Sequence, residues 1–397
     1  MIFRSAISTV SDTTTAVDEV CRVAAGLSAD LAVVFASHHH GPEFDDLLAG
    51  IIGRIDARNL IGCTGESIIG PDCEIEQSPA VVLWAAKMPG VKILPFCLDQ
   101  DDLVQFDGPA DWYDRLGVGP EDCPSFIVLP EPFSIHVDRC LEAMDSVFPL
   151  SLIVGGVASG ANGPGQNRLF LGDQVLRRGM VGVSLCGPVR VSTVVSQGCR
   201  PIGSPYVVTR AKENVITELG GRPVLEVLQE IFDTTSDADK ALIQKGLMLG
   251  RAVDARRETF RPGDFLIRNV MGIVEKKGIA INEMIRAGQT VQFHVRDSHT
   301  ASDEMASLLA TRVDELGGSP SGGLLFSCNG RGRRMFGLPH HDIGVVNRLA
   351  ERCTAAGFFA GGEIGPVGGQ TFVHGFTTSL ILFSEADTST NASVSPP

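Results

Sequence analysis

The chain has 397 residues, of which 44% are hydrophobic, and this size and composition predict a globular protein with more than one domain. Its formal net charge of −14 at pH 7 excludes a surface that binds nucleic acid mainly through phosphate contacts. No apolar stretch approaches the roughly 20 residues needed to span a bilayer, and the amino terminus lacks the apolar core of a signal peptide. Ten cysteines without Cys-x-x-Cys or a Cys/His ligand spacing indicate reduced thiols, so we expect a cytoplasmic protein without a metal site.

The amino-terminal part is predicted to start with a capped amphipathic helix over 11–27, which a βαβ unit follows. The strand, helix and strand of that unit are expected over 31–36, 44–55 and 60–63. Strands over 80–86 and 91–96 are predicted to pair with each other across a short turn. The acidic segment 98–124 is expected to be a solvated surface excursion, because its spacing does not match a calcium loop.

The middle and the carboxy-terminal part mix hairpins with further βαβ patterns, which predicts an α+β protein. Alternating apolar residues predict hairpins over 180–196 and 206–219, and Pro223 opens a helix that starts the second half. Strands are then expected over 247–252, 265–274, 278–281, 291–296 and 377–384, with a helix over 303–315 behind Ser302. Residues 385–397 are predicted to be a disordered tail.

One pattern occurs three times along the chain. An apolar run ends in a polar turn, a helix-length segment follows, and a second apolar run ends in a glycine-rich corner. The copies span residues 31–66, 126–160 and 323–365. Ligands of parallel βαβ sheets collect beyond the carboxyl ends of the strands, so the turns and corners indicate where a site lies.

The third copy resembles the FIST family through G-G-L-L-F-S-C-N-G-R-G (322–332), G-F-F-A-G-G-E-I-G (357–365) and H-G-F-T-T-S-L-I-L-F (374–383). I-G-C-T-G-E (61–66) and G-M-V-G-V-S-L (179–185) are similar to marks of the family's amino-terminal domain. The resemblance implies two related halves, each a mixed sheet with helices packed outside. It divides the chain into a leading strand and helix (1–27), an N-type domain (28–220), a C-type domain (221–384) and the tail.

The family resemblance also implies a function. It predicts a bacterial, cytoplasmic sensory module that binds a small molecule, usually thought to be an amino acid, and acts through a separate signalling protein. Membrane and nucleic-acid partners are not expected, and the sequence leaves open whether the chain forms a homo-oligomer. Some bacterial relatives are haem-based nitric oxide sensors. No cofactor is expected here, but a haem sensor stays an alternative, with His38 or His374 as the axial ligand.

Most candidate ligand contacts follow the strands of the third copy: Cys328, Asn329, Gly330, Arg331, Gly332, Gly361, Gly362 and Glu363. Arg331 offers a two-pronged donor for a carboxylate, and Glu363 suits an ammonium group, so together they predict a site for a zwitterionic amino acid. The alternative is that Arg331 and Glu363 pair with each other structurally.

An alternative interpretation is that the protein is an enzyme that uses Cys328 as its nucleophile. The arginines after it are expected to favour a thiolate, which would serve as a nucleophile in acyl or amide chemistry. Inert packing of Cys328 at the end of its strand is the other interpretation, and a pure scaffold also remains open.

The remaining candidates are Thr64, Glu66 and His38 in the first copy, together with His374 before the last strand. His38 opens a run of three histidines, from His38 to His40. Glu66 is interpreted as the equivalent of Glu363, so it either lines a second pocket or lies in water. Three consecutive histidines point in different directions, which favours loop or helix-start roles over one metal ion.

Overall fold

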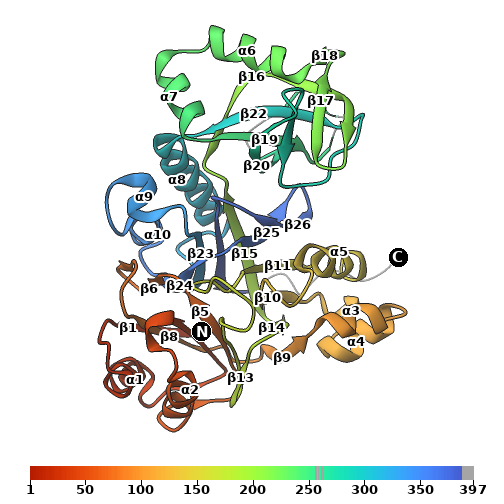
Figure 1. Ribbon diagram of the computed structural model, residues 1–397. Coiled ribbons are helices and arrows are strands. Elements are labelled where there is room, and N and C mark those ends of the chain that lie inside the picture. Colours follow the sequence, from red (N-terminus) through yellow and green to blue (C-terminus); the bar gives the residue numbers. More distant parts are fainter. Residues whose placement is uncertain (255–256, 258, 261–262, 387–397) are drawn as a thin grey trace.

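The computed structural model describes residues 1–254, 257, 259–260 and 263–386 (Figure 1). Strands account for 40% and helices for 27% of the chain, which confirms the α+β class. Of the predicted disordered tail, 385 and 386 are described, whereas 387–397 lie outside the described residues. Among the residues described, no helix combines the length and the apolar character needed to cross a membrane.

Three six-stranded sheets share one strand order, and each contains one of the repeated units. In order, the first sheet consists of β1 (Ile2–Ser8), β8 (Val81–Lys87), β3 (Leu31–Ser37), β5 (Leu60–Gly65), β12 (Leu169–Leu171) and β13 (Gln174–Leu176). The second consists of β9 (Lys92–Leu98), β14 (Met180–Cys186), β10 (Ser125–Pro130), β11 (Leu152–Gly156), β25 (Glu363–Val367) and β26 (Gln370–His374). The third consists of β15 (Val189–Ser196), β27 (Thr378–Glu385), β23 (Gly322–Cys328), β24 (Thr354–Ala360), β6 (Ile68–Ile69) and β7 (Glu74–Ile75). In each sheet the two strands of the βαβ unit are parallel, and the other pairings are antiparallel.

The outer hairpin of each sheet comes from another repeat. The hairpin β6–β7 follows the first βαβ unit but pairs with β24 of the third. The hairpin β12–β13 follows the second unit and pairs with β5 of the first. The hairpin β25–β26 follows the third unit and pairs with β11 of the second. The three repeats are therefore linked in a closed cycle of exchanged hairpins.

Helices cover the outer faces of the three sheets, and the inner faces enclose one common core. The covering helices are α1 (Thr13–Cys21) and α2 (Phe44–Ile52), α4 (Pro109–Leu116) and α5 (Val137–Val147), and α8 (Ser298–Glu315) and α10 (His341–Leu349). Strand β10 shows the alternation, since Ile127 and Leu129 face the common core whereas Phe126 and Val128 pack under α5. Each such buried side chain stabilises the fold by about 1.5–3 kcal/mol.

A separate seven-stranded sheet lies above the three repeats in Figure 1. It contains β16 (Cys199–Lys212), β22 (Thr290–Arg296), β19 (Leu247–Ala252), β20 (Phe265–Val274), β21 (Gly278–Ile281), β17 (Val215–Leu219) and β18 (Arg222–Pro223). Helices α6 (Val224–Thr234) and α7 (Asp237–Lys245) pack on it through their apolar faces. The short elements are β2 (Ser28–Ala29), β4 (Asp56–Ala57), α3 (Gln100–Gln105), α9 (Gly332–Phe336) and three 3₁₀ turns at Arg22–Ala24, His38–His40 and Pro120–Asp122.

The structure confirms the hairpin of β16 and β17 and corrects two other pairings. Strands β8 and β9 do not pair with each other, because β8 lies between β1 and β3 while β9 pairs with β14. Likewise β14 and β15 belong to different sheets. Nearly all residues of β8 and β14 are buried, which is typical of central strands with two partners rather than of hairpin arms.

Most acidic side chains of segment 98–124 are exposed or half-buried, which agrees with the predicted solvated surface segment. It contains α3 and α4, and its acids act at helix starts. Asp99 accepts hydrogen bonds from the backbone of Asp101 and Asp102, and Asp111 accepts one from Gly108 N. Aspartates that satisfy free amides at helix starts therefore explain the local charge.

Candidate functional site

One glycine in each repeat fixes how the three copies correspond. These glycines lie in the second strand of each βαβ unit, and each faces a carbonyl group of the first strand. A Cβ added at any of them would lie 1.8–2.0 Å from that carbonyl oxygen, so only glycine fits. The pairs are Gly62 opposite Val34, Gly155 opposite Val128, and Gly357 opposite Leu325.

Counting from these pairs shows that equivalent positions of all three repeats line one cavity of about 670 Å³. The positions just beyond the first strands are His38, Pro132 and Asn329, and those at the corners after the second strands are Glu66, Ser159 and Gly361. The cavity therefore lies where the carboxyl ends of the parallel strands of the three sheets meet. Sequence reasoning matched Glu66 with Glu363, but the strand register shows that Gly361 is its equivalent.

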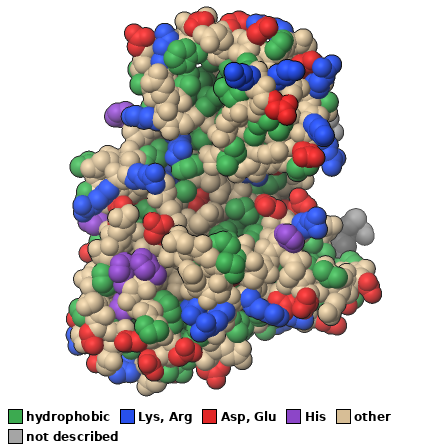
Figure 2. All heavy atoms as spheres, viewed as in Figure 1, with side chains coloured by type: hydrophobic (Ala, Val, Ile, Leu, Met, Phe, Trp, Pro, Cys, Tyr) green, Lys and Arg blue, Asp and Glu red, His purple; other side chains and the backbone are tan. Residues whose placement is uncertain are grey.

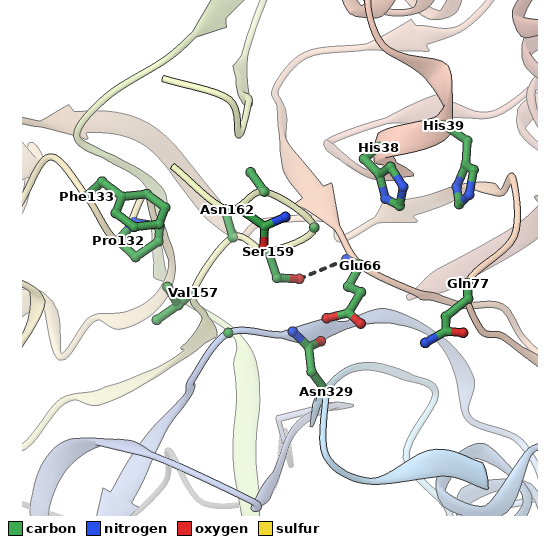
Figure 3. Close-up of a pocket in the computed structure, with 14 residues that line it drawn as sticks. His38, His39, Glu66, Gln77, Pro132, Phe133, Val157, Ser159, Asn162 and Asn329 are labelled. Atoms are coloured by element: carbon green, nitrogen blue, oxygen red, sulfur yellow. Dashed lines mark hydrogen bonds between the residues drawn. The ribbon is translucent and has the colours of Figure 1, made fainter. Parts of the chain in front are cut away.

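The cavity has a polar side and an apolar side (Figure 3). His38, His39, Glu66, Gln77 and Asn329 line the polar side, and the opposite side carries Pro132, Phe133 and Val157. Phe133 is 47% exposed, so its ring is accessible to a molecule in the cavity. This division suits a small molecule with a polar and an apolar end.

Glu66 is held by its backbone, and its carboxylate points into the cavity toward Asn329 (Figure 3). Glu66 N donates to the Ser159 hydroxyl at 2.8 Å, and that hydroxyl in turn donates to the carbonyl of Phe359. One serine thus links the corners of all three repeats. Among the described residues, the buried Oδ1 atom of Asn329 has no hydrogen-bond partner. The Glu66 carboxylate is an acceptor suited to a ligand N–H or ammonium group.

The two histidines of the cavity lie on the 3₁₀ turn after β3, with ring centroids 4.0 Å apart. Burial, together with the neighbouring His38, lowers the pKa of His39. A neutral His39 ring both donates and accepts a hydrogen bond. Its Nδ1 lies 3.3 Å from the hydroxyl of Ser37. This arrangement leaves the other ring nitrogen available for a ligand.

Arg331 lies outside the cavity and is completely buried. Its guanidinium donates to Asp342 through Nε at 2.7 Å and Nη2 at 2.8 Å. Burial alone would raise the pKa of Asp342, but the adjacent Arg331 holds it well below its usual range. Arg331 therefore uses its two-pronged set of donors to bind a carboxylate of the protein itself. The predicted zwitterion site built from Arg331 and Glu363 is wrong, because neither lines the cavity and Arg331 pairs with Asp342.

Cys328, the last residue of β23, and Glu363, the first residue of β25, are buried beside each other. Burial, reinforced by the Glu363 carboxyl, raises the pKa of the Cys328 thiol to about 12. The expectation that arginines stabilise a thiolate here is contradicted, because desolvation outweighs the charge of Arg331. Glu363 accepts a hydrogen bond from Thr377 N at 3.0 Å, and burial raises its pKa well above the ordinary value.

The other predicted contacts have structural surroundings. Thr64 is buried, and its hydroxyl accepts a hydrogen bond from Arg168 N. His374 is buried, its Nε2 donates to Gly365 O at 2.9 Å, and burial lowers its pKa to about 4. Because the His374 ring is enclosed, it is not accessible as an axial ligand of a haem. His38 lies among the polar residues of the cavity rather than in the apolar surroundings that a haem prefers. Gly330, Gly332 and Gly362 lie outside the cavity lining. In the described part of the chain, no group of three or more His, Cys, Asp and Glu side chains is placed to hold a metal ion.

Of the predicted contacts, the structure brings together His38, Glu66, Asn329 and Gly361. The sequence reasoning missed the other lining residues, which are His39, Gln77, Pro132, Phe133, Val157, Ala158, Ser159, Gly160, Ala161 and Asn162. The signal that would have found Pro132 and Ser159 is the register of the three glycines, because it places them at the positions of His38 and Glu66.

Comparisons with known proteins agree with the resemblance noted in the sequence. The FIST N domain matches residues 30–222, and the FIST C domain matches residues 225–366. An uncharacterized protein of Mycobacterium tuberculosis is 41% identical over 360 residues, which cover 90% of this chain and 92% of that protein. An uncharacterized protein of Mycobacterium bovis is 40% identical over 360 residues, which again cover 90% of this chain and 92% of that protein. Among solved structures, a cyanuric acid hydrolase from A. caulinodans aligns with 97% of this chain and 99% of its own, with a TM-score of 0.38 and 9% identity.

Proposed function

Because the chain belongs to the FIST family, whose domains are sensory ligand-binding modules, we propose that it binds a small amino compound in the cavity shared by the three repeats. The observation that carries the proposal is that the Glu66 carboxylate points into this cavity toward the side chain of Asn329, which lines the same cavity. A cationic amino group placed between them gains a charge-assisted hydrogen bond.

An amino acid with an apolar side chain fits both sides of the cavity. Its ammonium group is placed at Glu66, and its side chain lies against Phe133 and Val157. Its carboxylate faces the imidazoles of His38 and His39, which supply N–H donors in the absence of any Lys or Arg in the cavity lining. Cavities of this size usually bind ligands of metabolite size.

Isothermal titration calorimetry with a panel of amino acids tests the proposal. At least one is expected to bind the wild-type protein, and Glu66→Gln is expected to weaken its binding by about tenfold or more, since a hydrogen bond to a charged group contributes about 1.5–3 kcal/mol. Glu226→Gln removes the same charge from an exposed position on α6 and serves as the matched control. Equal binding by wild type and Glu66→Gln would refute the assignment of the amino group.

We further propose that the ligand-bound state is read by a separate signalling protein, as the family's sensory role implies. Proteins that co-purify with the wild type in the presence and absence of ligand can be compared by mass spectrometry. A partner whose recovery changes with ligand for the wild type but not for Glu66→Gln supports this output. Recovery that is independent of ligand in both proteins contradicts it.

A further inference from the structure

A second cavity, of about 330 Å³, opens between α7, the end of β22, the start of α8 and α9. Three cations line it: Lys245 on α7, Arg296 on β22 and Arg334 on α9. Among the described residues, no acidic side chain belongs to its lining, although the chain as a whole carries a net charge of −14. Figure 2 shows Lys and Arg side chains gathered on this flank of the molecule, between the positions of α7 and α9 in Figure 1.

These three cations have no acidic partner among the described residues. Within the described part of the chain, no salt bridge or side-chain hydrogen bond to a protein acceptor is formed by Lys245, Arg296 or Arg334. Arg296 is half-buried, and its guanidinium lies 3.1 Å from the ring centroid of Phe376, which holds it in place. Burial lowers the pKa of Arg296, and the charge of Arg334 acts in the same direction. A guanidinium placed away from carboxylates is a fixed donor for an external anion.

The start of α8 adds to this positive field. Ser298, the first residue of this 18-residue helix, lines the cavity, so the positive end of the helix dipole faces it. The nearby capping residue Asp297 is already engaged, because its carboxylate accepts from His299 N and the Thr300 hydroxyl and pairs with Arg200. Its charge is therefore largely offset by protein donors.

We propose that this cavity binds a phosphate group, either as a free inorganic anion or as part of a phosphorylated small molecule. Three converging cations and a helix start suit a tetrahedral anion that carries more than one charge. The site is separate from the central cavity, but the two share one loop, because Gly330 lines this site and the preceding Asn329 lines the central one.

Calorimetric titration of the full chain with inorganic pyrophosphate tests the proposal. Pyrophosphate is expected to bind, and Arg334→Gln is expected to weaken binding by about tenfold or more. Arg334 is exposed, so its replacement is compatible with folding. Arg333→Gln is the matched control, because this neighbouring exposed arginine shares another cavity with Arg334 but does not line the proposed phosphate site. Pyrophosphate binding by this control is expected to stay within about threefold of wild type. Glu66→Gln is expected to bind pyrophosphate like wild type, which separates this site from the central cavity.

Adenosine diphosphate and citrate complete the experiment. Tighter binding of the nucleotide than of pyrophosphate identifies a phosphorylated metabolite, and the reverse identifies the inorganic anion. Citrate, a carboxylate of comparable charge, is expected to bind more weakly than either. Three results overturn the proposal: no binding of either phosphate compound, equal loss in Arg333→Gln and Arg334→Gln, or citrate binding as tightly as pyrophosphate.

Discussion

Replacing Arg331 with methionine tests whether this arginine belongs to the fold rather than to a ligand site. The substitution keeps a long side chain but leaves the carboxylate of Asp342, which is 1% exposed, without its cation. Removing one partner of a buried ion pair costs about 3–5 kcal/mol, because the remaining charge is desolvated and unpaired. Hydroxyls of Ser327 and Thr378 continue to donate to Asp342 at 2.7 and 2.8 Å, which favours the lower end of that range.

Urea denaturation followed by tryptophan fluorescence measures this cost. Trp84 is a suitable reporter, because it lies in the common core and its Nε1 donates to Thr354 O of the third repeat at 2.9 Å. The double variant Arg331→Met/Asp342→Asn removes both charges and retains acceptor oxygen for the two hydroxyls. The decrease in its free energy of unfolding is expected to be smaller, by at least about 2 kcal/mol, than the sum of the decreases in the two single variants.

Arg333→Met is the control for the experiment on Arg331, because Arg333 is exposed and two residues away. Its stability is expected to stay within about 0.5 kcal/mol of wild type. A loss below about 1 kcal/mol for Arg331→Met, or strict additivity in the double variant, would refute the view of Arg331 as a structural cation.

Three further predictions follow from the site and its surroundings. A thiol reagent at pH 8 is expected to modify the exposed Cys123 but not Cys328, whose pKa is raised to about 12, and peptide mass spectrometry that found equal modification would contradict the buried thiol. Burial and the neighbouring Asp342 raise the pKa of Glu74 from 4.5 to about 8, so its contribution to stability is complete below pH 4.5 and is lost as the pH rises through 8. The urea midpoint of the wild type should therefore fall more between pH 6 and 9 than that of Glu74→Gln, and parallel pH profiles would disprove this. Gly155→Ala is expected to lower the melting temperature, because its Cβ would overlap Val128 O, whereas Gly344→Ala on α10 has open space and should raise it slightly; an unchanged melting temperature for Gly155→Ala would show that the register is wrong.

The sequence predicted the repeated units and the place of the site, because both depend on local signals. Apolar runs, polar turns and glycine corners specify each βαβ unit within a stretch of 35 to 43 residues. The position of the carboxyl ends of its strands follows from the fold class. The strand pairings of β8 and β14 were not predictable in this way, because their partners lie far away in the sequence. Strand pairing across such distances is set by the assembled core rather than by neighbouring residues.

The prediction that Arg331 contacts a ligand was wrong for a related reason. An arginine between glycines is typical of an exposed ligand contact, and nothing in its immediate neighbourhood indicates burial. Its partner Asp342 arrives on α10, and the cover over both comes from β27 and α8. Glu66 was recognised as a corner carboxylate, but the cavity that it lines is completed by Ser159 and Asn329 from the other two repeats.

The exchange of hairpins among the repeats means that neither half of the chain forms a self-sufficient body. A break near residue 223 would strip β25 from the exposed edge of β11 and would deprive β6 and β15 of β24 and β27. The two stretches that the family recognises are therefore interlocked parts of one scaffold. Shortening the protein to a single FIST domain would destroy the central cavity rather than isolate it, because residues from both domains line that cavity.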